Sequence, residues 1–232
     1  MGSTRLPGKI LKPILQKTLL EYEIERLKRV KSATQIIIAT TTDKKDDAVE
    51  ALCKKIDIEV FRGSESDVLS RYFEAAKKFK ASVVVRITAD CPLIEPEIVD
   101  QAIRIFLESP SSASYVSNTI HRTFPRGLDV EVFSFEALKN AHEKATDQAD
   151  REHVTPFIKR HTDLPHLKNI LHSEDFSHYR WTVDTPEDFE LIKRVLEALY
   201  PQDPHFTLKD VLRLLEIHPD WPQINAHIEQ KK

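Results

Sequence analysis

The sequence lacks several features that identify common protein classes. Its two cysteines, Cys53 and Cys91, stand apart and form no CxxC pair, so neither a disulfide framework nor a paired-thiol redox motif is expected. The ten histidines are scattered, without an HExxH motif or a Cys/His cluster, which argues against a zinc site. No apolar run reaches the roughly 20 residues that a membrane span needs, and no secretory hydrophobic segment occurs. We therefore expect a cytoplasmic protein without a membrane partner.

An excess of basic charge is also lacking. The 232 residues include 34 Lys and Arg against 37 Asp and Glu, so no surplus of cations remains to neutralise a nucleic acid, and no nucleic-acid partner is expected. Glycine is scarce too, and each of the four glycines is expected where the backbone needs freedom. What the chain does have is 41% hydrophobic and 31% charged residues, which is the balance of a globular protein with a sizeable core.

Short apolar runs alternate with amphipathic segments along the first half of the chain. Continuous β-branched runs predict buried strands, and apolar residues at helical spacing predict the helices between them. This alternation indicates α/β structure with βαβ units, a mostly parallel central sheet and helices on both faces. Closely spaced strand patterns predict an antiparallel insertion around 113–135, inside a single domain that spans 1–232. The expected strands are 34–41, 58–63, 81–90, 114–118, 127–135 and 178–184, and the expected helices are 18–30, 46–56, 66–80, 95–108, 135–145, 151–161, 185–200 and 208–219.

The opening stretch GSTRLPGK (2–9) has the chemistry of a phosphate-binding loop without the spacing of a Walker A motif. Five residues separate its glycines where the motif has four, and no hydroxyl residue follows Lys9. Gly2 and Ser3 let backbone N–H groups approach an anion closely. Arg5 offers a fork that matches phosphate oxygens, and Lys9 offers a point charge. Taken alone, these residues fit a phosphate site and a basic surface turn equally well.

Two aspartates are expected at the carboxyl edge of the sheet, where α/β proteins bind their ligands. Asp90 closes the expected strand 81–90, and Asp184 closes the expected strand 178–184. Carboxylate oxygens at this edge suit a hard cation such as Mg²⁺, with phosphate oxygens completing its coordination. From the residues alone, each aspartate fits a turn or a helix cap about as well as a metal site.

Six sequence blocks, in order along most of the chain, resemble the sugar-activating cytidylyltransferases. The resemblance is greatest to the branch of the spore coat polysaccharide biosynthesis protein F, which is related to the acylneuraminate and KDO cytidylyltransferases. Any single block is a weak signal, but their joint occurrence is highly specific. The blocks are MGSTRLPGKILKPI (1–14), GSESDVLSRY (63–72), VRITADCPLI (85–94), FPRGLDVEVF (124–133), REHVTPFI (151–158) and TVDTPEDFELI (182–192).

The resemblance implies a Rossmann-like nucleotide-diphospho-sugar transferase fold and a nucleotidyltransferase activity. In that activity CMP passes from CTP to a sugar hydroxyl with release of pyrophosphate, for surface or spore coat polysaccharide biosynthesis. The resemblance makes Asp90 and Asp184 the metal ligands for Mg²⁺, and it makes Arg5 and Lys9 the catalytic cations that neutralise the phosphates. The implied partners are CTP, a sugar acceptor and a second copy in a homodimer.

The resemblance also assigns residues to the nucleotide and to the sugar. Arg86 lies within an apolar strand and therefore needs a partner, which is either a carboxylate or the nucleotide. Asp129 and Glu131 alternate with apolar residues, so they share a strand face that fits a polyhydroxylated ligand or solvent. Glu152 or His153 fits the proton acceptor, although His153 fits a packed structural histidine equally well. The expected nucleotide-binding residues are Gly2, Ser3, Thr4, Arg5, Lys9, Thr40, Thr41, Asp43, Ser70, Arg71 and Arg86, and the expected sugar-binding residues are Arg126, Asp129, Glu131, Glu152 and His153.

Three other functions stay open. A glycosyltransferase of similar topology would use a nucleotide sugar, but such enzymes typically carry a DxD motif at a strand end, which this sequence lacks. A related nucleotidyltransferase would use another nucleotide or an alditol phosphate. A catalytically impaired polysaccharide-assembly protein would bind without transferring CMP.

The family pattern also has a short apolar strand directly before Met-Gly-Ser, and this N-terminal strand is missing here. Burying a strand of about six residues would contribute on the order of 10 kcal/mol, which is about the stability of a typical domain. We therefore expect that translation starts upstream and that Met1 is an internal residue of the loop.

Overall fold

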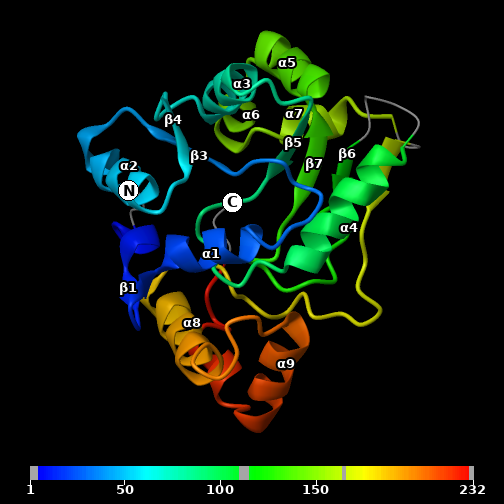
Figure 1. The fold of residues 1–232 in the computed structure, drawn as a ribbon. Coiled ribbons are helices and arrows are strands. Elements are labelled where there is room, and N and C mark those ends of the chain that lie inside the picture. The colour runs from blue at the N-terminus through cyan, green and yellow to red at the C-terminus, as the bar shows by residue number, and fades with distance from the viewer. Residues whose placement is uncertain (1–4, 110–114, 164–165, 230–232) are drawn as a thin grey trace.

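The computed structural model describes residues 5–109, 115–163 and 166–229. Its first part is a run of βαβ units, as the alternating sequence pattern predicts (Figure 1). Strand β3 pairs in parallel with β4, so that Ile37 lies opposite Glu59 and Thr41 lies opposite Gly63. The elements of this part are β3 (Ile37–Thr41), α2 (Asp47–Lys55), β4 (Glu59–Gly63), α3 (Val68–Lys78) and β5 (Val83–Arg86).

A four-stranded sheet in the order β5-β7-β6-β8 forms the middle of the molecule. Strand β7 (Glu131–Ser134) is antiparallel to both of its neighbours, β5 and β6 (Tyr115–Ser117), whereas β6 and β8 (Leu167–Asn169) pair in parallel. It follows that β5, β6 and β8 run in one direction and β7 alone of these four is reversed. The α/β class and the mostly parallel strand direction are confirmed, and the antiparallel strands lie in the segment where the sequence predicts them.

Helices cover both faces of this sheet because consecutive strand residues point to opposite sides. Tyr115 and Phe133 pack into one core with α3, α5 and α7, while Val116 and Val132 pack into another core with α4. Figure 1 shows α3, α5, α6 and α7 gathered at one end of the molecule and α8 and α9 at the other. The bounds are α1 (Leu19–Leu27), α4 (Pro96–Leu107), α5 (Phe135–Lys144), α6 (Gln148–His153), α7 (Pro156–Arg160), α8 (Pro186–Leu199) and α9 (Leu208–Ile217), and a small hairpin of β1 (Pro13–Ile14) and β2 (Lys17–Thr18) precedes α1. Within the described residues no helix is both long and apolar enough to traverse a membrane.

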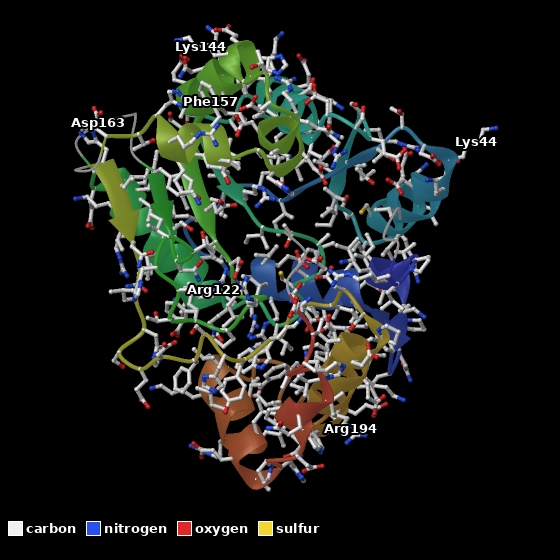
Figure 2. All side chains as sticks on the ribbon, turned by 180° about the vertical axis from the view of Figure 1, so that it is seen from behind. Lys44, Arg122, Lys144, Phe157, Asp163 and Arg194 are labelled. Atoms are coloured by element: carbon white, nitrogen blue, oxygen red, sulfur yellow. The ribbon has the colours of Figure 1, made fainter. Side chains whose placement is uncertain are left out.

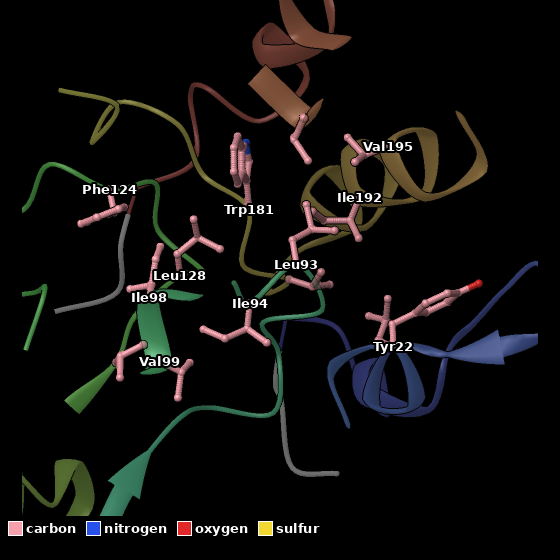
Figure 3. Close-up of a cluster of buried hydrophobic side chains, with 14 of the residues drawn as sticks. Tyr22, Leu93, Ile94, Ile98, Val99, Phe124, Leu128, Trp181, Ile192 and Val195 are labelled. Atoms are coloured by element: carbon pink, nitrogen blue, oxygen red, sulfur yellow. The ribbon is translucent and has the colours of Figure 1, made fainter. Parts of the chain in front are cut away.

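The largest core cluster joins the chain segments that carry the expected site. Figure 3 shows Trp181 packed beside Leu128, and Leu93 and Ile94 lying between α8 and α4. Trp181 is fully buried. This packing fixes the loop after β5 and the segment before α8, which carry Asp90 and Asp184.

Gly127 permits a close crossing of two segments within this core. Its φ is +99°, and a Cβ atom there would lie 2.5 Å from the backbone nitrogen of Thr182. Backbone hydrogen bonds join the segments on either side, because Trp181 N–H donates to the Arg126 carbonyl over 2.7 Å. A side chain at position 127 would therefore push the two segments apart.

Several expected elements are wrong in extent or type. The segment 178–184 is not a strand, and its only ladder contact among the described residues is an isolated bridge between Arg126 and Arg180. Strand β5 ends at Arg86, so Asp90 lies in the following loop and does not close the strand. The expected helix 151–161 is broken at Val154, whose φ is +70°, into the end of α6 and the whole of α7. The sequence analysis missed β8 and the β1–β2 hairpin entirely.

Candidate active site

The two aspartates expected at the sheet edge do meet. Asp90 lies in the loop between β5 and α4, and Asp184 lies directly before α8; their segments touch where Val183 N–H donates to the Asp90 carbonyl over 2.9 Å. The Lys9 ammonium lies between the two carboxylates, 2.5 Å from Asp90 Oδ2 and 2.8 Å from Asp184 Oδ1. The pair is therefore close enough to share a single cation.

Asp184 is held by two further cations on its other oxygen. The guanidinium of Arg180 lies 2.7 Å from Asp184 Oδ2, and that of Arg5 lies 3.0 Å from the same atom. Burial by itself would raise the pKa of Asp184, but Lys9, Arg5 and Arg180 together lower it, so the carboxylate is ionised at neutral pH.

Arg180 is in turn oriented by Asp188, a residue with 0% exposure at the start of α8. Arg180 Nε donates to Asp188 Oδ1 over 2.9 Å, and the backbone N–H of Asp184 donates to Asp188 Oδ2 over the same distance. The Asn225 amide also donates to Asp188 Oδ1. Asp188 thus fixes both the backbone of Asp184 and the cation that pairs with it.

Lys9 pairs with the two carboxylates, and its role on the phosphates stays a prediction. Burial opposes its charge, but Asp90 and Asp184 raise the pKa of Lys9 above its ordinary value. In this structure its ammonium binds the carboxylates, so a role on phosphate would require it to exchange partners. Arg5 is likewise paired with Asp184. The neighbouring expected residues Gly2, Ser3 and Thr4 lie outside the described residues.

Glu23 of α1 lies beneath the Asp90 loop. Its Oε2 accepts the backbone N–H of Cys91 over 3.1 Å. Complete burial, with the Asp90 carboxylate nearby, raises the pKa of Glu23 well above its usual range. Burial also raises the pKa of the Cys91 thiol, which therefore stays protonated and inert, in line with its expected part as a packing residue. The sequence analysis did not single out Glu23.

The expected nucleotide residues at the end of β3 lie together but are already hydrogen-bonded. The hydroxyls of Thr40 and Thr41 donate to Asp46 Oδ2 over 2.6 and 2.7 Å. Asp43 caps the following short helix by accepting the backbone N–H of Lys45. This end of the sheet is thus a compact turn that offers backbone groups more readily than free side chains.

Two arginines expected to contact the nucleotide line the cavity between β3 and β5. Arg71 of α3 donates to the Ser64 carbonyl, and its buried Nε has no hydrogen-bond partner among the described residues. The same holds for the buried Nε of Arg86, while its Nη1 pairs with Glu131. Ser70, the remaining residue of the set, contributes its backbone N–H to the Asp67 cap of α3.

The Arg86–Glu131 ion pair bears on the expectations for both partners. The Arg86 guanidinium finds a carboxylate, one of its two expected partners. Glu131 also accepts from the hydroxyls of Tyr115 and Thr155, so both of its oxygens are engaged. Burial opposes ionisation, yet Arg86 lowers the pKa of Glu131. Such a buried and fully bonded carboxylate fits a structural role better than a sugar contact.

Asp129 and Arg126 lie on the segment that crosses at Gly127. Asp129 forms a bidentate ion pair with Arg122, in which the two guanidinium nitrogens lie 2.5 and 2.7 Å from the two carboxylate oxygens. Burial, and then the nearby Arg122, lower the pKa of Arg126. Arg122, Arg126 and Asp129 therefore form one cluster, of which Arg122 was missed by the sequence analysis.

Glu152 and His153 differ from expectation in position. They lie at the end of α6, rather than opening a helix, and both are exposed. No hydrogen bond or ion pair links either side chain to a described residue of the carboxylate pair. Neither is placed by a contact to accept a proton there, and their assignment stays a prediction.

Among the described residues, no group of three or more His, Cys, Asp or Glu side chains is arranged to hold a metal ion. The two carboxylates that share Lys9 are therefore the candidate ligands, with any further ligands coming from a substrate. Arg180 and Asp188, which organise the pair, were missed. The sequence does contain a feature that marks Asp188, because Thr185 and Asp188 have the spacing of a helix capping box.

Comparison with known proteins decides the family. The sequence profile of the family described as cytidylyltransferase matches residues 1–215. The chain belongs to the cytidylyltransferase family. The resemblance noted from the six sequence blocks is thereby confirmed, and this cytidylyltransferase is a nucleotidyltransferase enzyme.

The relatives of this cytidylyltransferase include proteins of bacteria and archaea. It is 35% identical over 230 residues to the spore coat polysaccharide biosynthesis protein SpsF of Bacillus subtilis, covering 95% of this chain and 92% of that protein. It is also 35% identical over 240 residues to an uncharacterised protein of Methanocaldococcus jannaschii, covering 99% and 93%. A 3-deoxy-manno-octulosonate cytidylyltransferase of Geobacter sulfurreducens matches at 32% over 110 residues, covering 47% and 43%.

Solved structures give the same family and fold. A cytidylyltransferase from Leptospira borgpetersenii superposes with a TM-score of 0.89 at 34% identity, covering 100% of this chain and 95% of that one. A CMP:2-keto-3-deoxy-manno-octonic acid synthetase complexed with CTP superposes with a TM-score of 0.61 at 18% identity, covering 84% and 94%. At that low identity, the second likeness supports the fold alone.

Proposed function

We propose that this cytidylyltransferase transfers CMP from CTP to a sugar hydroxyl and releases pyrophosphate, in the biosynthesis of a surface or spore coat polysaccharide. The observation that carries the proposal is the carboxylate pair, since Asp90 and Asp184 share one cation at the rim of the sheet. The names of the relatives support CTP as the donor and a sugar acid or polysaccharide precursor as the acceptor.

The transfer is a single in-line displacement. The sugar oxygen forms a bond to the α-phosphorus of CTP, the bond from that phosphorus to the bridging oxygen breaks, and pyrophosphate leaves with the electron pair. The proton of the attacking hydroxyl is released to solvent. No covalent intermediate with a protein side chain is required.

The residues present fit a divalent cation. Asp90 and Asp184 would hold Mg²⁺, because they already converge on the Lys9 ammonium, and carboxylate oxygens are the ligands that Mg²⁺ prefers. When bound, Mg²⁺ supplies positive charge beside the triphosphate. Lys9 would then be free to exchange the carboxylates for phosphate oxygens. Arg5, the most exposed cation of the cluster, would bind the departing pyrophosphate.

The test measures pyrophosphate release from each of the four nucleoside triphosphates in the presence of Mg²⁺ and a panel of sugars. We expect CTP to be preferred, and replacement Asp90→Asn or Asp184→Asn to reduce the rate about 10²–10³-fold, as is typical when a key electrostatic group is lost. The exposed Asp220, which caps a short helix without a side-chain hydrogen bond, provides the control Asp220→Asn, expected to match the parent.

The same measurement separates the other candidates. Release that is faster with another nucleotide would reassign the donor within the nucleotidyltransferases. Turnover of a nucleotide sugar, without pyrophosphate release from any triphosphate, would indicate a glycosyltransferase. Absence of both reactions, in protein shown to be folded by circular dichroism, would favour a catalytically impaired assembly protein.

A further inference from the structure

The Lys9 ammonium bridges the two carboxylates that are the candidate metal ligands. It contacts one oxygen of each, Asp90 Oδ2 at 2.5 Å and Asp184 Oδ1 at 2.8 Å. Carboxylate oxygens are also the ligands that Mg²⁺ prefers, so the ammonium and a divalent ion would use the same acceptors. Two cations beside one pair of oxygens that is shielded from water repel each other strongly. A divalent ion at this pair would therefore have to displace the ammonium.

The backbone that carries Lys9 is fixed, so this bridge is a feature of the fold. Lys9 begins η1, a short 3-10 helix (Lys9–Leu11) that follows Gly8 at a φ of +67°. The N–H of Lys9 donates to the Leu6 carbonyl over 3.2 Å, and Leu6 is buried in the largest core cluster. In Figure 1 and, seen from behind, in Figure 2, this opening segment (dark blue) lies beside α8. The ammonium is thus held at the carboxylate pair by an anchored segment.

The surroundings of the ammonium make its displacement costly. The side chains of Lys9, Asp90 and Asp184 are only 13%, 19% and 17% exposed. Within the described part of the chain, the two carboxylates are the hydrogen-bond acceptors of the ammonium. An ammonium displaced from them would lose both acceptors at once, and a shielded charge without a partner is unfavourable. This cost disappears only if other anionic oxygens come within reach of Lys9.

We propose that Lys9 is an internal competitor of the divalent cation. Its ammonium keeps the affinity of the free enzyme for a metal ion low, and the ion binds firmly only when a polyphosphate supplies Lys9 with new acceptors. The polyphosphate half of this inference rests on the proposed function, whereas the competition depends on three side chains alone. Because coupling between two ligands is reciprocal, the metal ion should in turn strengthen the binding of the nucleotide.

Arg5 provides a control with the same charge. Its guanidinium lies 3.0 Å from Asp184 Oδ2, whereas Lys9 contacts Oδ1 of the same carboxylate. Arg5→Gln therefore removes one positive charge from Asp184 and leaves the bridging ammonium in place. Lys9→Met removes the bridging charge and keeps an unbranched side chain. The comparison of these two variants separates competition for the bridging position from a general effect of net charge.

The test measures Mn²⁺ binding to the free protein, without nucleotide. Mn²⁺ accepts carboxylate oxygens as Mg²⁺ does, and the loss of the electron paramagnetic resonance signal of unbound Mn²⁺ reports binding. We expect Lys9→Met to bind Mn²⁺ about 10-fold or more tightly than the parent, and Arg5→Gln to change Kd by less than about threefold. Equal affinity in Lys9→Met and the parent would overturn the proposal. An equally large gain in Arg5→Gln would also overturn it, because net charge alone would then explain both.

Thermal melts cover the case in which the two carboxylates destabilise the fold once Lys9 is removed. A ligand that binds only the folded protein raises Tm according to its affinity, so about 10 mM Mg²⁺ should raise the Tm of Lys9→Met by several degrees and that of the parent by less than about 1 °C. A variant that folds only when Mg²⁺ is present would support the proposal as well. A destabilised or unfolded variant that gains nothing from Mg²⁺ would contradict it, because the ion would then be unable to replace the ammonium.

CTP binding tests whether Lys9 exchanges its partners. With Mg²⁺ present, the ammonium should contact phosphate, so Lys9→Met should weaken CTP binding about 10-fold. With EDTA in place of the metal, the ammonium stays on the carboxylates, and the same variant should weaken CTP binding by about threefold or less. An equal factor under both conditions would refute the exchange. If the parent does not bind CTP at all, the proposed function fails, while the Mn²⁺ measurement still decides whether Lys9 competes with the metal ion.

Discussion

Replacement of Asp188 by Asn tests how the carboxylate pair is organised. Asp188 has 0% exposure and accepts hydrogen bonds from Arg180, Asn225 and the backbone of Asp184. Asp188→Asn keeps the shape but leaves the 5%-exposed Arg180 facing an amide. Loss of one partner of a buried ion pair costs about 3–5 kcal/mol. Because Arg180 keeps its contact with Asp184, we expect about 3 kcal/mol here.

Urea unfolding followed by circular dichroism measures this loss, and a domain of this size should also melt about 6–12 °C lower. The matched control is Glu190→Gln, whose exposed pair with Arg194 contributes roughly 0–1 kcal/mol. Pyrophosphate release should fall in Asp188→Asn even at temperatures where the protein is folded, because Asp184 loses its alignment. A destabilisation below about 1 kcal/mol, no greater than the control, would refute the view that Asp188 holds Arg180 and Asp184 in place.

Three further predictions concern other parts of the chain. Burial opposes ionisation of Asp67, but its ion pair with Arg151 lowers the pKa of the carboxyl. The stability that this pair provides is present above the unfolded pKa of about 3.9 and is lost as the pH falls through the lower folded pKa. The free energy of unfolding in urea should therefore vary less between pH 5 and pH 2 for Asp67→Asn than for the parent protein. Gly127→Ala should lower the free energy of unfolding by more than about 1 kcal/mol, because the φ of Gly127 is +99° and the new Cβ would lie 2.5 Å from the Thr182 nitrogen. Thermal melts measure this loss, and an unchanged Tm would show that the two crossing segments can relax. Arg126→Gln should raise KM for the sugar severalfold and leave KM for CTP unchanged, with the exposed Arg213→Gln as control; an equal rise in both constants would argue against a sugar contact.

The sequence predicted the layered α/β fold because buried apolar residues recur at regular spacing in strands and helices. The consecutive β-branched residues within 34–41 and 81–90 indicate strands, and the α1 and α8 capping boxes mark helix starts through local hydrogen bonds. The segment 178–184 misled this reasoning. Trp181 and Val183 are buried, but they are covered by side chains of α8 and the loop of Leu128 rather than by ladder partners, and an apolar pattern does not distinguish the two situations.

The site was predictable only in part, for a related reason. Asp90 and Asp184 stand out because each follows an apolar run and precedes a proline-started helix, and the structure brings them together. Arg180 and Arg122 carry no such mark, since their roles depend on partners that tertiary packing supplies. Glu131 shows the opposite error: its alternation with apolar residues correctly indicated a strand face, but that face is turned toward Arg86 in the interior.

Glu23 contacts both the cavity between β3 and β5 and the loop that carries Asp90. This side chain lines the cavity and also accepts the backbone N–H of Cys91, the residue after Asp90. Its carboxyl is fully buried, and this burial raises its pKa and favours the protonated form. A change at Glu23 should therefore alter both the lining of this cavity and the position of the Asp90 loop, since the same side chain contacts both.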